Sequence, residues 1–494
     1  MQKVFLRADA GATIGYGHFV RSLALAAMLK DDFDCTLFTS TPSDIKGSVI
    51  PSQLSDFQKR EAEGVCRLTE LPSDDSRFEI FLKLLKGDEI VVLDNYFYSE
   101  DYVRAIQVHG CKVVRVQDFF GEKSIADAMI FPCRSPRNAL LRPPFLANYG
   151  EGSAENAVIP NEKVRVIQPI QPEPVCPQQS AEGNGREGRW VVTFGGSDPL
   201  GLTGRYVREL RERGLEPLTL SGGQGADEVA ELFRSAEGVI CSASSVCYEA
   251  LACGCKVCAG WYIDNQKDFY DLLIDRGLIL PLGDLRTSPS STEAPAQGCT
   301  STNGPACPVA LPQDLSVAPA SPEIAVAFHQ APQYYRILFK ALELEMVNYT
   351  DLTPEQSREV WQLRNADDIR CWMTNPDTFS FESHCRFIES LKSRPDREYY
   401  AFFKDGLLVG SYDFTDIVQG GSADSGLFVN PAAQGQGIAK QMAARMDSIA
   451  CKHGISALSA VVLESNDRSL RFHQSIGYEI TSHENGVYHL VKQL

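Results

Sequence analysis

The feature that most constrains the fold is an alternation of short apolar segments with helical patterns. Residues 3–8 predict a strand, a glycine-rich loop follows, and an apolar helical pattern runs from about 17 to 30. Further apolar runs occupy 89–94 and 112–117, each after a helical pattern. Strands that alternate with helices in this way form a doubly wound parallel sheet. The sequence therefore predicts an α/β fold for this part of the chain.

A second alternation begins at 189–194 and continues through 217–220, 238–241 and 256–259. The segment 169–188 before it is rich in Pro, Gln and Gly, which is typical of a loop or linker. Two such halves resemble the GT-B architecture, in which two Rossmann-like halves face each other across a cleft. This resemblance implies a nucleotide-sugar enzyme.

A chain of 494 residues exceeds what one hydrophobic core usually holds, and at about 150 residues per domain it predicts three domains. We expect them at 1–168, 189–344 and 345–494. The insert 287–322 is of low complexity and is predicted to be disordered. Residues 324–344 predict a helix that could close the second half.

The composition excludes several classes of function. A net charge of −17 argues against a nucleic-acid or anionic-membrane partner. No signal-peptide pattern opens the sequence, and no apolar stretch reaches the roughly 20 residues of a membrane span. The 15 cysteines are scattered, as in proteins of the reducing cytosol, so a cytoplasmic location is expected. Cys253, Cys255 and Cys258 have no second Cys or His pair at zinc spacing, so we expect buried thiols and no metal.

The segment 426–447 carries the clearest chemical signal. A strand at 426–429 leads into Gln434–Ala439, which opens an amphipathic helix. Glycines here let backbone N–H groups approach a ligand, and a helix N-terminus favours an anionic pyrophosphate. The alternative interpretation is an ordinary glycine-capped helix.

A strand at 456–462 and the segment Asn466–Tyr478 follow, and this order of features resembles the GNAT acetyltransferase family over residues 345–494. The resemblance implies that acetyl-coenzyme A lies against the strand 426–429, with its pyrophosphate on the amides of the glycine-rich turn. The residues implied to contact this cosubstrate are Leu427, Val429, Gln434, Gly435, Gln436, Gly437, Ile438, Ala439 and Asn466.

The resemblance also implies an acid and a base. The family usually has a Tyr, four residues before the Gly of a Gly-Phe pair, that protonates the departing thiolate. His473 occupies that place before Gly477 and Tyr478, and a histidine can donate a proton near neutral pH. The alternative is a histidine on the helix surface. Asp424 or Asp413 could relay the amine proton through water, although either could instead be structural.

The segments 363–373 and 381–391 narrow the acceptor. They resemble the N-acetyltransferases of pseudaminic acid biosynthesis, which acetylate the 4-amino group of a UDP-linked 4-amino-4,6-dideoxy sugar. The resemblance implies that Arg364 and Asn365 bind the substrate. Related GNAT enzymes for ribosomal proteins and other amino sugars share this Arg-Asn pattern.

In the first half, residues 7–21 place His18 at the start of a helix, after a strand and a glycine-rich turn. Side chains at that position of an open α/β sheet point into the crevice at the carboxyl ends of the strands. A neutral imidazole there can act as a general base. The alternative is that His18 caps the helix or packs between the halves.

In the second half, residues 193–199 place glycines before a helix, which suits a phosphate. Ser244 and Ser245 form a small-residue turn that opens another helix, with Glu249 one turn further on. Such a turn can hold a pyrophosphate on its amides while a carboxylate accepts ribose hydroxyls.

These motifs in this order resemble the UDP-sugar hydrolases of pseudaminic acid biosynthesis, over residues 1 to about 285. The family splits UDP-2,4-diacetamido-2,4,6-trideoxy-L-altrose into UDP and the free sugar. The resemblance implies His18 as the base, and amides of the two turns as metal-free stabilisers of the departing diphosphate. The implied substrate-binding residues are Gly15, Gly17, Arg21, Gly195, Gly196, Ser197, Asp198, Ser244, Ser245, Glu249, Asn265 and Gln266.

The two resemblances support each other, because the acetyltransferase product is the hydrolase substrate. A flexible linker would hold the two sites at a high effective concentration. Three alternatives stay open: a GT-B glycosyltransferase, a hydrolysing 2-epimerase of a related nonulosonic acid pathway, each fused to an amino-sugar acetyltransferase, and a non-enzymatic nucleotide-sugar sensor.

Overall fold

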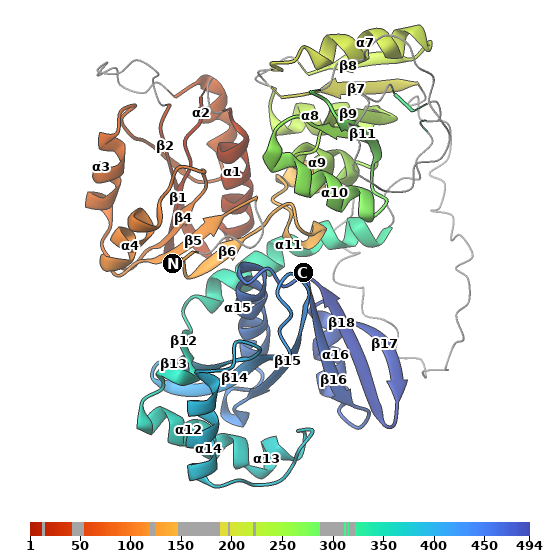
Figure 1. Ribbon diagram of the computed structural model, residues 1–494. Coiled ribbons are helices and arrows are strands. Elements are labelled where there is room, and N and C mark those ends of the chain that lie inside the picture. Colours follow the sequence, from red (N-terminus) through yellow and green to blue (C-terminus); the bar gives the residue numbers. More distant parts are fainter. Residues whose placement is uncertain are drawn as a thin grey trace.

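A computed structural model describes most of the chain and contains three β-sheets among the described residues (Figure 1). The residues described are 1–11, 15–41, 54–118, 124–146, 188–195, 198–220, 224–286, 311–312, 315 and 322–494. The predicted disorder of 287–322 and most of the predicted linker 169–188 lie outside these residues.

The first sheet has the strand order β3-β2-β1-β4-β5-β6, and every pairing in it is parallel. All four residues of β4 are buried, as expected for a strand covered by helices on both faces. The order reverses between β1 and β4, which is the switch point where such sheets bind ligands. The elements are β1 (Gln2–Arg7), α1 (Gly17–Leu29), β2 (Phe33–Thr39), α2 (Asp56–Ala62), β3 (Arg67–Glu70), α3 (Ser76–Leu84), β4 (Ile90–Leu93), α4 (Glu100–Val108), β5 (Lys112–Val116) and β6 (Ala128–Ile130).

The second sheet is also parallel, with the order β11-β10-β9-β7-β8 and its switch point between β7 and β9. The two parallel sheets confirm the α/β prediction for this part of the chain. The elements are η1 (Pro136–Asn138), α5 (Pro143–Leu146), β7 (Arg189–Thr193), α7 (Leu202–Glu212), β8 (Glu216–Thr219), α8 (Ala226–Ser235), β9 (Gly238–Ser242), α9 (Ser245–Ala252), β10 (Lys256–Trp261), η2 (Asp264–Gln266), α10 (Lys267–Asp275) and β11 (Leu280–Asp284).

Helix α11 (Pro322–Ala341) confirms the helix predicted near 324–344 and joins the second parallel sheet to the rest of the chain. Phe328 packs in the core of the second half, as expected. Tyr335 and Phe339, further along the helix, instead pack against α1 in the core of the first half. The helix therefore fastens both halves rather than closing the second half alone.

The third sheet has the order β12-β13-β14-β15-β16-β18-β17 and is antiparallel except where β15 meets β16. Helix α15 crosses between these two parallel strands (Figure 1). The elements are β12 (Glu345–Asn348), η3 (Tyr349–Asp351), α12 (Pro354–Asn365), α13 (Asp367–Arg370), α14 (Phe381–Leu391), β13 (Glu398–Lys404), β14 (Leu407–Thr415), β15 (Ser422–Val429), η4 (Pro431–Ala433), α15 (Ile438–Lys452), β16 (Ala457–Leu463), α16 (Asp467–Ser475), β17 (Glu479–Glu484) and β18 (Val487–Gln493).

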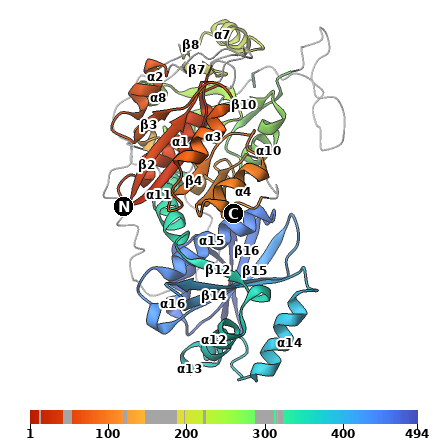
Figure 2. The same ribbon diagram turned by 90° about the vertical axis from the view of Figure 1, so that its left-hand side faces the viewer.

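The third sheet does not hang freely from the chain, because α15 packs against the first half (Figures 1 and 2). The Ser448 hydroxyl donates to the carbonyl of Met129 in β6 at 3.1 Å and accepts from its N–H at 2.8 Å. Arg134 donates to the backbone carbonyls of Ile455 and Leu494. Within the described residues, no helix combines the length and apolar character needed to cross a bilayer. In that same part of the chain, no cluster of three or more His, Cys, Asp or Glu could hold a metal ion.

Candidate functional sites

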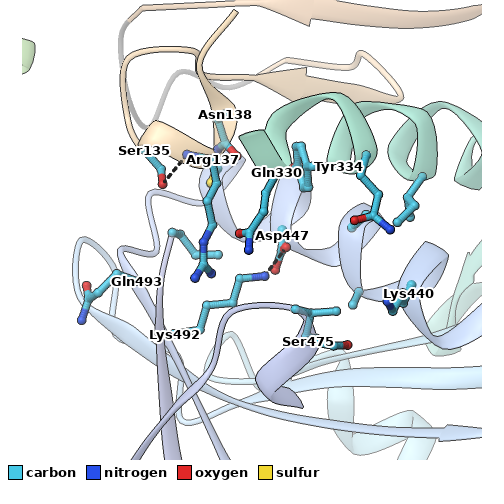
Figure 3. A pocket seen from close by; sticks show the side chains of 17 residues that line it. Ser135, Arg137, Asn138, Gln330, Tyr334, Lys440, Asp447, Ser475, Lys492 and Gln493 are labelled. Atoms are coloured by element: carbon cyan, nitrogen blue, oxygen red, sulfur yellow. Dashed lines mark hydrogen bonds and ion pairs between the residues drawn. The ribbon is translucent and has the colours of Figure 1, made fainter. Parts of the chain in front are cut away.

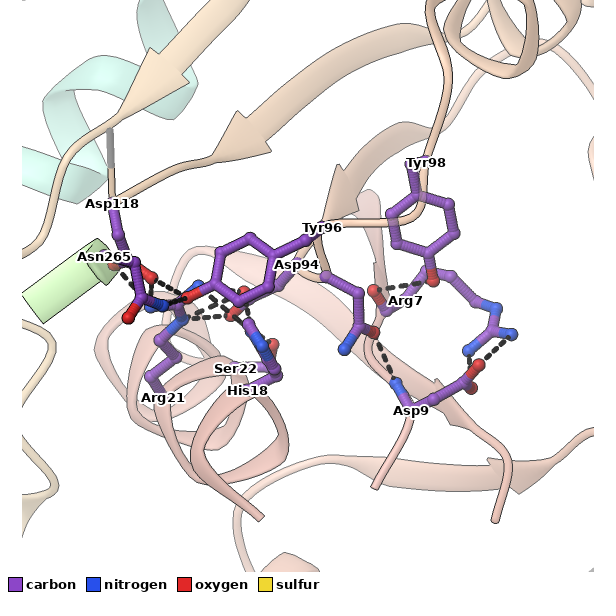
Figure 4. A network of polar contacts seen from close by, with 11 residues as sticks. Arg7, Asp9, His18, Arg21, Ser22, Asp94, Tyr96, Tyr98, Asp118 and Asn265 are labelled. Atoms are coloured by element: carbon purple, nitrogen blue, oxygen red, sulfur yellow. Dashed lines mark hydrogen bonds and ion pairs between the residues drawn. The ribbon is translucent and has the colours of Figure 1, made fainter. Parts of the chain in front are cut away.

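His18 lies at the start of α1, next to the switch point of the first sheet (Figure 4). Its Nδ1 atom is 2.8 Å from Oδ1 of Asp94, the residue that directly follows β4. A carboxylate only accepts hydrogen bonds, so Nδ1 carries the ring proton and Nε2 keeps its lone pair. The contact therefore orients His18 with a proton-accepting nitrogen turned away from Asp94.

Arg21, one turn further along α1, holds this carboxylate in its ionised form. Its guanidinium donates to both oxygens of Asp94 and, at 2.7 Å, to Asp118 after β5. Burial works to raise the pKa of Asp94, but the charge of Arg21 and the hydrogen bonds from His18 and Arg21 outweigh it, so the pKa lies below its ordinary value. Asp94 is therefore a buried anion that can stabilise a charged imidazolium.

Two further side chains connect this cluster to the second half (Figure 4). The Tyr96 hydroxyl donates to Asp118, and its ring lies edge-on to His18 at 4.8 Å between centroids. Asn265, from η2 of the second half, donates its Nδ2 to the Tyr96 hydroxyl at 3.1 Å. The structure therefore brings together His18, Arg21 and Asn265, which the sequence analysis had named separately.

Sequence reasoning missed the groups that join them, namely Asp94, Tyr96 and Asp118. A signal was present, since Asp94 ends one predicted strand run and Asp118 follows another, both in the first half. Polar residues at the carboxyl ends of parallel strands share one edge of the sheet. Applied to both runs, this rule would have placed the two carboxylates beside His18.

The predicted glycine turns lie at the ends of β1 and β7. Gly15 has a positive φ of 74° and forms a backbone bridge to Gly11, while Gly17 begins α1. Gly195 follows β7 with a φ of 82°. The predicted contacts Gly196 and Ser197 lie outside the described residues.

Several predicted contacts of the second half are engaged in local structure. The Asp198 carboxylate accepts from the N–H groups of Leu202 and Thr203, both at 2.9 Å, and so caps α7. The Gln266 amide oxygen accepts from the N–H of Tyr262 at 3.0 Å. These bonds stabilise the loops around the site, and substrate contacts by Asp198 and Gln266 stay predictions.

Ser244 and Ser245 lie at the second switch point, where Ser244 is the N-cap of α9 and Ser245 its first residue. Glu249 is only 7% exposed, and its carboxylate lies 3.6 Å from the guanidinium of Arg142. Burial raises the pKa of Glu249 above its ordinary value, against the opposing effect of Arg142. The predicted ribose contact of Glu249 is not tested by this arrangement.

In the C-terminal part, the turn before α15 presents a row of unused amides. Gly435 and Gly437 have φ values of 79° and 75°, which favour glycine. The backbone N–H groups of residues 435–439 donate to no acceptor among the described residues. Four of the residues 434–437 around them are exposed. Such a row at a helix N-terminus suits a pyrophosphate, as the sequence predicts.

The strand that leads into this turn separates from its neighbour. β15 pairs with β16 only at Ser422, Ala423 and Asp424, so the two strands part before Leu427 and Val429. At the point of parting, the Ser425 hydroxyl lies 2.8 Å from that of Tyr478. The backbone of β15 is thus unpaired on this side along the stretch where the resemblance implies acetyl-coenzyme A.

Asp413 has the electrostatics of a general base. It lies in β14 beside Gly426 of β15, where a Cβ would come within 3.0 Å of the carboxylate. Burial raises the pKa of Asp413 to about 7, despite the nearby cations Arg364 and Arg397. Nη1 of Arg364 is buried without a hydrogen-bond partner. Arg364 and Asp413 together therefore offer a cation and a titrating carboxyl to an acceptor.

The remaining predicted residues of this part are less free. Asp424 is exposed and accepts from the Ser459 hydroxyl, whereas His473 is buried and contacts the Ser469 carbonyl through Nδ1 at 2.8 Å. Burial also lowers the pKa of His473. Asn466 caps α16, and the Asn365 amide makes two hydrogen bonds with the backbone of Phe379. Their catalytic or binding roles stay predictions.

Comparisons with known proteins bear on this C-terminal part. Residues 358–478 match the model of the acetyltransferase (GNAT) family. The acetyltransferase PseH of Campylobacter jejuni subsp. jejuni serotype O:2 is 24% identical over 147 residues, which are 30% of this chain and 92% of that protein.

Two solved structures cover the same region. The crystal structure of Campylobacter jejuni PseH in complex with acetyl coenzyme A has 23% identity and a TM-score of 0.26, and covers 30% of this chain and 98% of its own. That of a Vibrio cholerae spermidine N-acetyltransferase with CoA and spermine has 17% identity and a TM-score of 0.28, and covers 31% and 95%. The family match and the similarity to PseH identify the C-terminal part of this chain as a GNAT acetyltransferase domain.

Proposed function

We propose that this chain catalyses two consecutive reactions on a UDP-linked amino sugar in the cytoplasm. The C-terminal domain transfers an acetyl group from acetyl-coenzyme A to the 4-amino group of a UDP-4-amino-4,6-dideoxy sugar. The two parallel-sheet domains, arranged as in GT-B enzymes, then hydrolyse the resulting UDP-2,4-diacetamido-2,4,6-trideoxy-L-altrose to UDP and free sugar. The similarity to PseH supports the first step, and the His18 cluster supports the second.

Acetyl-coenzyme A supplies a reactive thioester in the first step. Its pyrophosphate would accept from the unused amides of residues 435–439, and its pantetheine arm would lie along the unpaired edge of β15. The amine nitrogen attacks the thioester carbonyl, the carbon–sulfur bond breaks, and the thiolate leaves. Leu427 and Val429 line the strand at that place.

The amine must lose a proton in this step, and the thiolate must gain one. Asp413 accepts the amine proton, because a carboxyl with a pKa of about 7 is half ionised at neutral pH. Asp424, exposed on β15, is the second candidate for this relay. His473 donates to the thiolate if the bound cosubstrate raises its protonated fraction, which its contact with Ser469 alone does not favour.

The observation that carries the second step is the oriented pair of His18 and Asp94 at the first switch point, facing Asn265 from the second half. Nε2 of His18 accepts a proton from water, the water oxygen attacks the anomeric carbon, and the bond to the diphosphate oxygen breaks. UDP leaves with the bonding electrons. Asp94 stabilises the imidazolium that forms.

The departing diphosphate needs positive electrostatic potential. The second switch point supplies it from the amides at Gly195 and at the start of α9, where Ser244 and Ser245 lie. Arg21 is engaged by Asp94 and Asp118, so it holds the catalytic carboxylate rather than the diphosphate.

Mass spectrometry of the products tests this proposal. The full chain is incubated with UDP-4-amino-4,6-dideoxy-N-acetylaltrosamine, with and without acetyl-coenzyme A. We expect UDP and the free diacetamido sugar only when acetyl-coenzyme A is present. Acetylation with no UDP release would contradict the hydrolase assignment, and UDP release only with a sugar or lipid acceptor would indicate a glycosyltransferase. NMR spectroscopy of the released sugar distinguishes a hydrolysing 2-epimerase.

A further inference from the structure

A cavity of about 120 Å³ lies between the first half, α11 and the GNAT domain (Figure 3). Its lining comes from η1 on one side, from α11 on another, and from α15, the end of α16 and β18 on the third. A single water fills roughly 10–15 Å³ of such volume, so the cavity has room for a small organic molecule. It is separate from both sites described above.

The charges around this cavity do not balance. Lys492 donates to Asp447, so these two opposite charges compensate each other. Arg137 and Lys440 also line the cavity, and neither has an ion-pair partner within 4 Å among the described residues. The cavity therefore carries an excess of positive charge.

Arg137 is the key group. Among the described residues its guanidinium makes no hydrogen bond and no ion pair, and only its backbone N–H is engaged, by Ser135. Burial lowers the pKa of Arg137, against the weaker opposing effects of Glu479 and Asp447. Leaving a cation partly buried without a counter-ion costs free energy. A planar guanidinium of this kind recovers that cost by binding a carboxylate or phosphate through two hydrogen bonds.

Neutral donors complete the lining. Gln330 and Gln333 project from α11, and Figure 3 shows the Gln330 amide close to the Arg137–Lys492 side of the cavity. Ile337 and Ile476 provide an apolar wall. This combination of convergent polar groups and apolar surface is typical of a small-molecule site.

We propose that this cavity binds a small anion bearing a phosphate or carboxylate group, held by Arg137 and Lys440. The bound anion bridges η1 of the first half and α15 of the GNAT domain. The Arg137 guanidinium also lies against Gly477, where a Cβ would overlap it, and Tyr478 next to it contacts Ser425 of β15. Occupation of the cavity is therefore connected to the strand that the acetyl donor would line.

Isothermal titration calorimetry of the full chain tests the site. The probes are inorganic phosphate and, in a separate arm, acetate, at constant ionic strength with chloride as the balancing ion. Saturating UDP and coenzyme A are present throughout, so that the other phosphate-binding turns are filled. We expect saturable binding of at least one probe, and the arm that binds identifies the anion class.

The variants Arg137→Gln and Lys440→Gln should each weaken that binding about 10- to 100-fold, the usual worth of a hydrogen bond to a charged group. Arg208→Gln, an exposed arginine on α7, is the matched control and should bind as the wild type does. Binding of neither probe, or equal binding by the wild type and a folded Arg137→Gln or Lys440→Gln protein, would overturn the proposal.

Discussion

Nδ1 of His18 lies 2.8 Å from Oδ1 of Asp94, across the switch point between β1 and β4. The two residues are 76 positions apart in the chain, and the parallel sheet brings them together. Because the Asp94 carboxylate is also held by Arg21, the imidazole is fixed in one tautomer and one orientation. This relationship makes several outcomes predictable.

Replacing Asp94 with Asn should impair hydrolysis without preventing acetylation. An amide at this position can donate to Nδ1 and so favours the wrong tautomer of His18, and it removes the charge that stabilises the imidazolium. We expect UDP release to slow roughly 10²- to 10⁴-fold. A coupled assay for UDP measures this, with Asp101→Asn on the exposed face of α4 as the matched control. Normal UDP release by a folded Asp94→Asn protein would exclude the role.

Acetyl transfer should depend on pH through Asp413. The base works only when ionised, and its pKa is raised to about 7, so the rate should climb between about pH 6 and 8. Asp413→Asn should lower the rate and remove this limb of the profile, whereas Asp405→Asn, at an exposed turn, should leave both unchanged. If Asp413→Asn keeps the wild-type profile, Asp424 or water is the base.

The same shift affects stability, with a definite sign. The folded-state pKa of Asp413 lies above its unfolded value, so the folded protein retains a proton that the unfolded chain loses. The contribution of Asp413 to the free energy of unfolding is therefore full below about pH 4 and declines as the pH rises to about 7. Chemical denaturation of the wild type and Asp413→Asn across this range should show a smaller decline for the variant.

Replacing Gly437 with Trp should abolish binding of coenzyme A. Gly437 has a φ of 75°, which a side chain disfavours, and the indole would cover the amides of residues 435–439. Gly420→Trp is the control, because Gly420 has the same φ and open surroundings but lies in another turn. Calorimetry with coenzyme A decides the matter, and equal affinity of both variants would refute the binding turn.

His473 is predicted to protonate the departing thiolate. Its replacement by Phe should lower turnover more than it raises the Michaelis constant, because a proton donor acts in the transition state. His489→Phe, an exposed position on β18, is the control. Turnover of His473→Phe equal to that of wild type at neutral pH would show that the ring packs against Tyr478 and that another group is the acid.

Local patterns predicted the elements well, and the contacts between distant segments less well. The helix at Gly17 and the turn before Ile438 follow from glycines and apolar periodicity within one segment. Asp94 and Asp118 could be found only by superimposing the ends of separate strands. The pairing of Glu249 with Arg142 depends on how α9 meets the connection between the halves, which no local pattern encodes.

The most direct test of the account is product analysis with His18→Asn. The full chain receives the UDP-amino sugar and acetyl-coenzyme A, and mass spectrometry follows the acetylated UDP-sugar and UDP over time. His109→Asn, an exposed histidine at the end of α4, serves as the control. We predict that His18→Asn still acetylates, accumulates the acetylated UDP-sugar, and releases UDP about 10²- to 10⁴-fold more slowly than the control. Release of UDP at the control rate would contradict the assignment of His18 as the base.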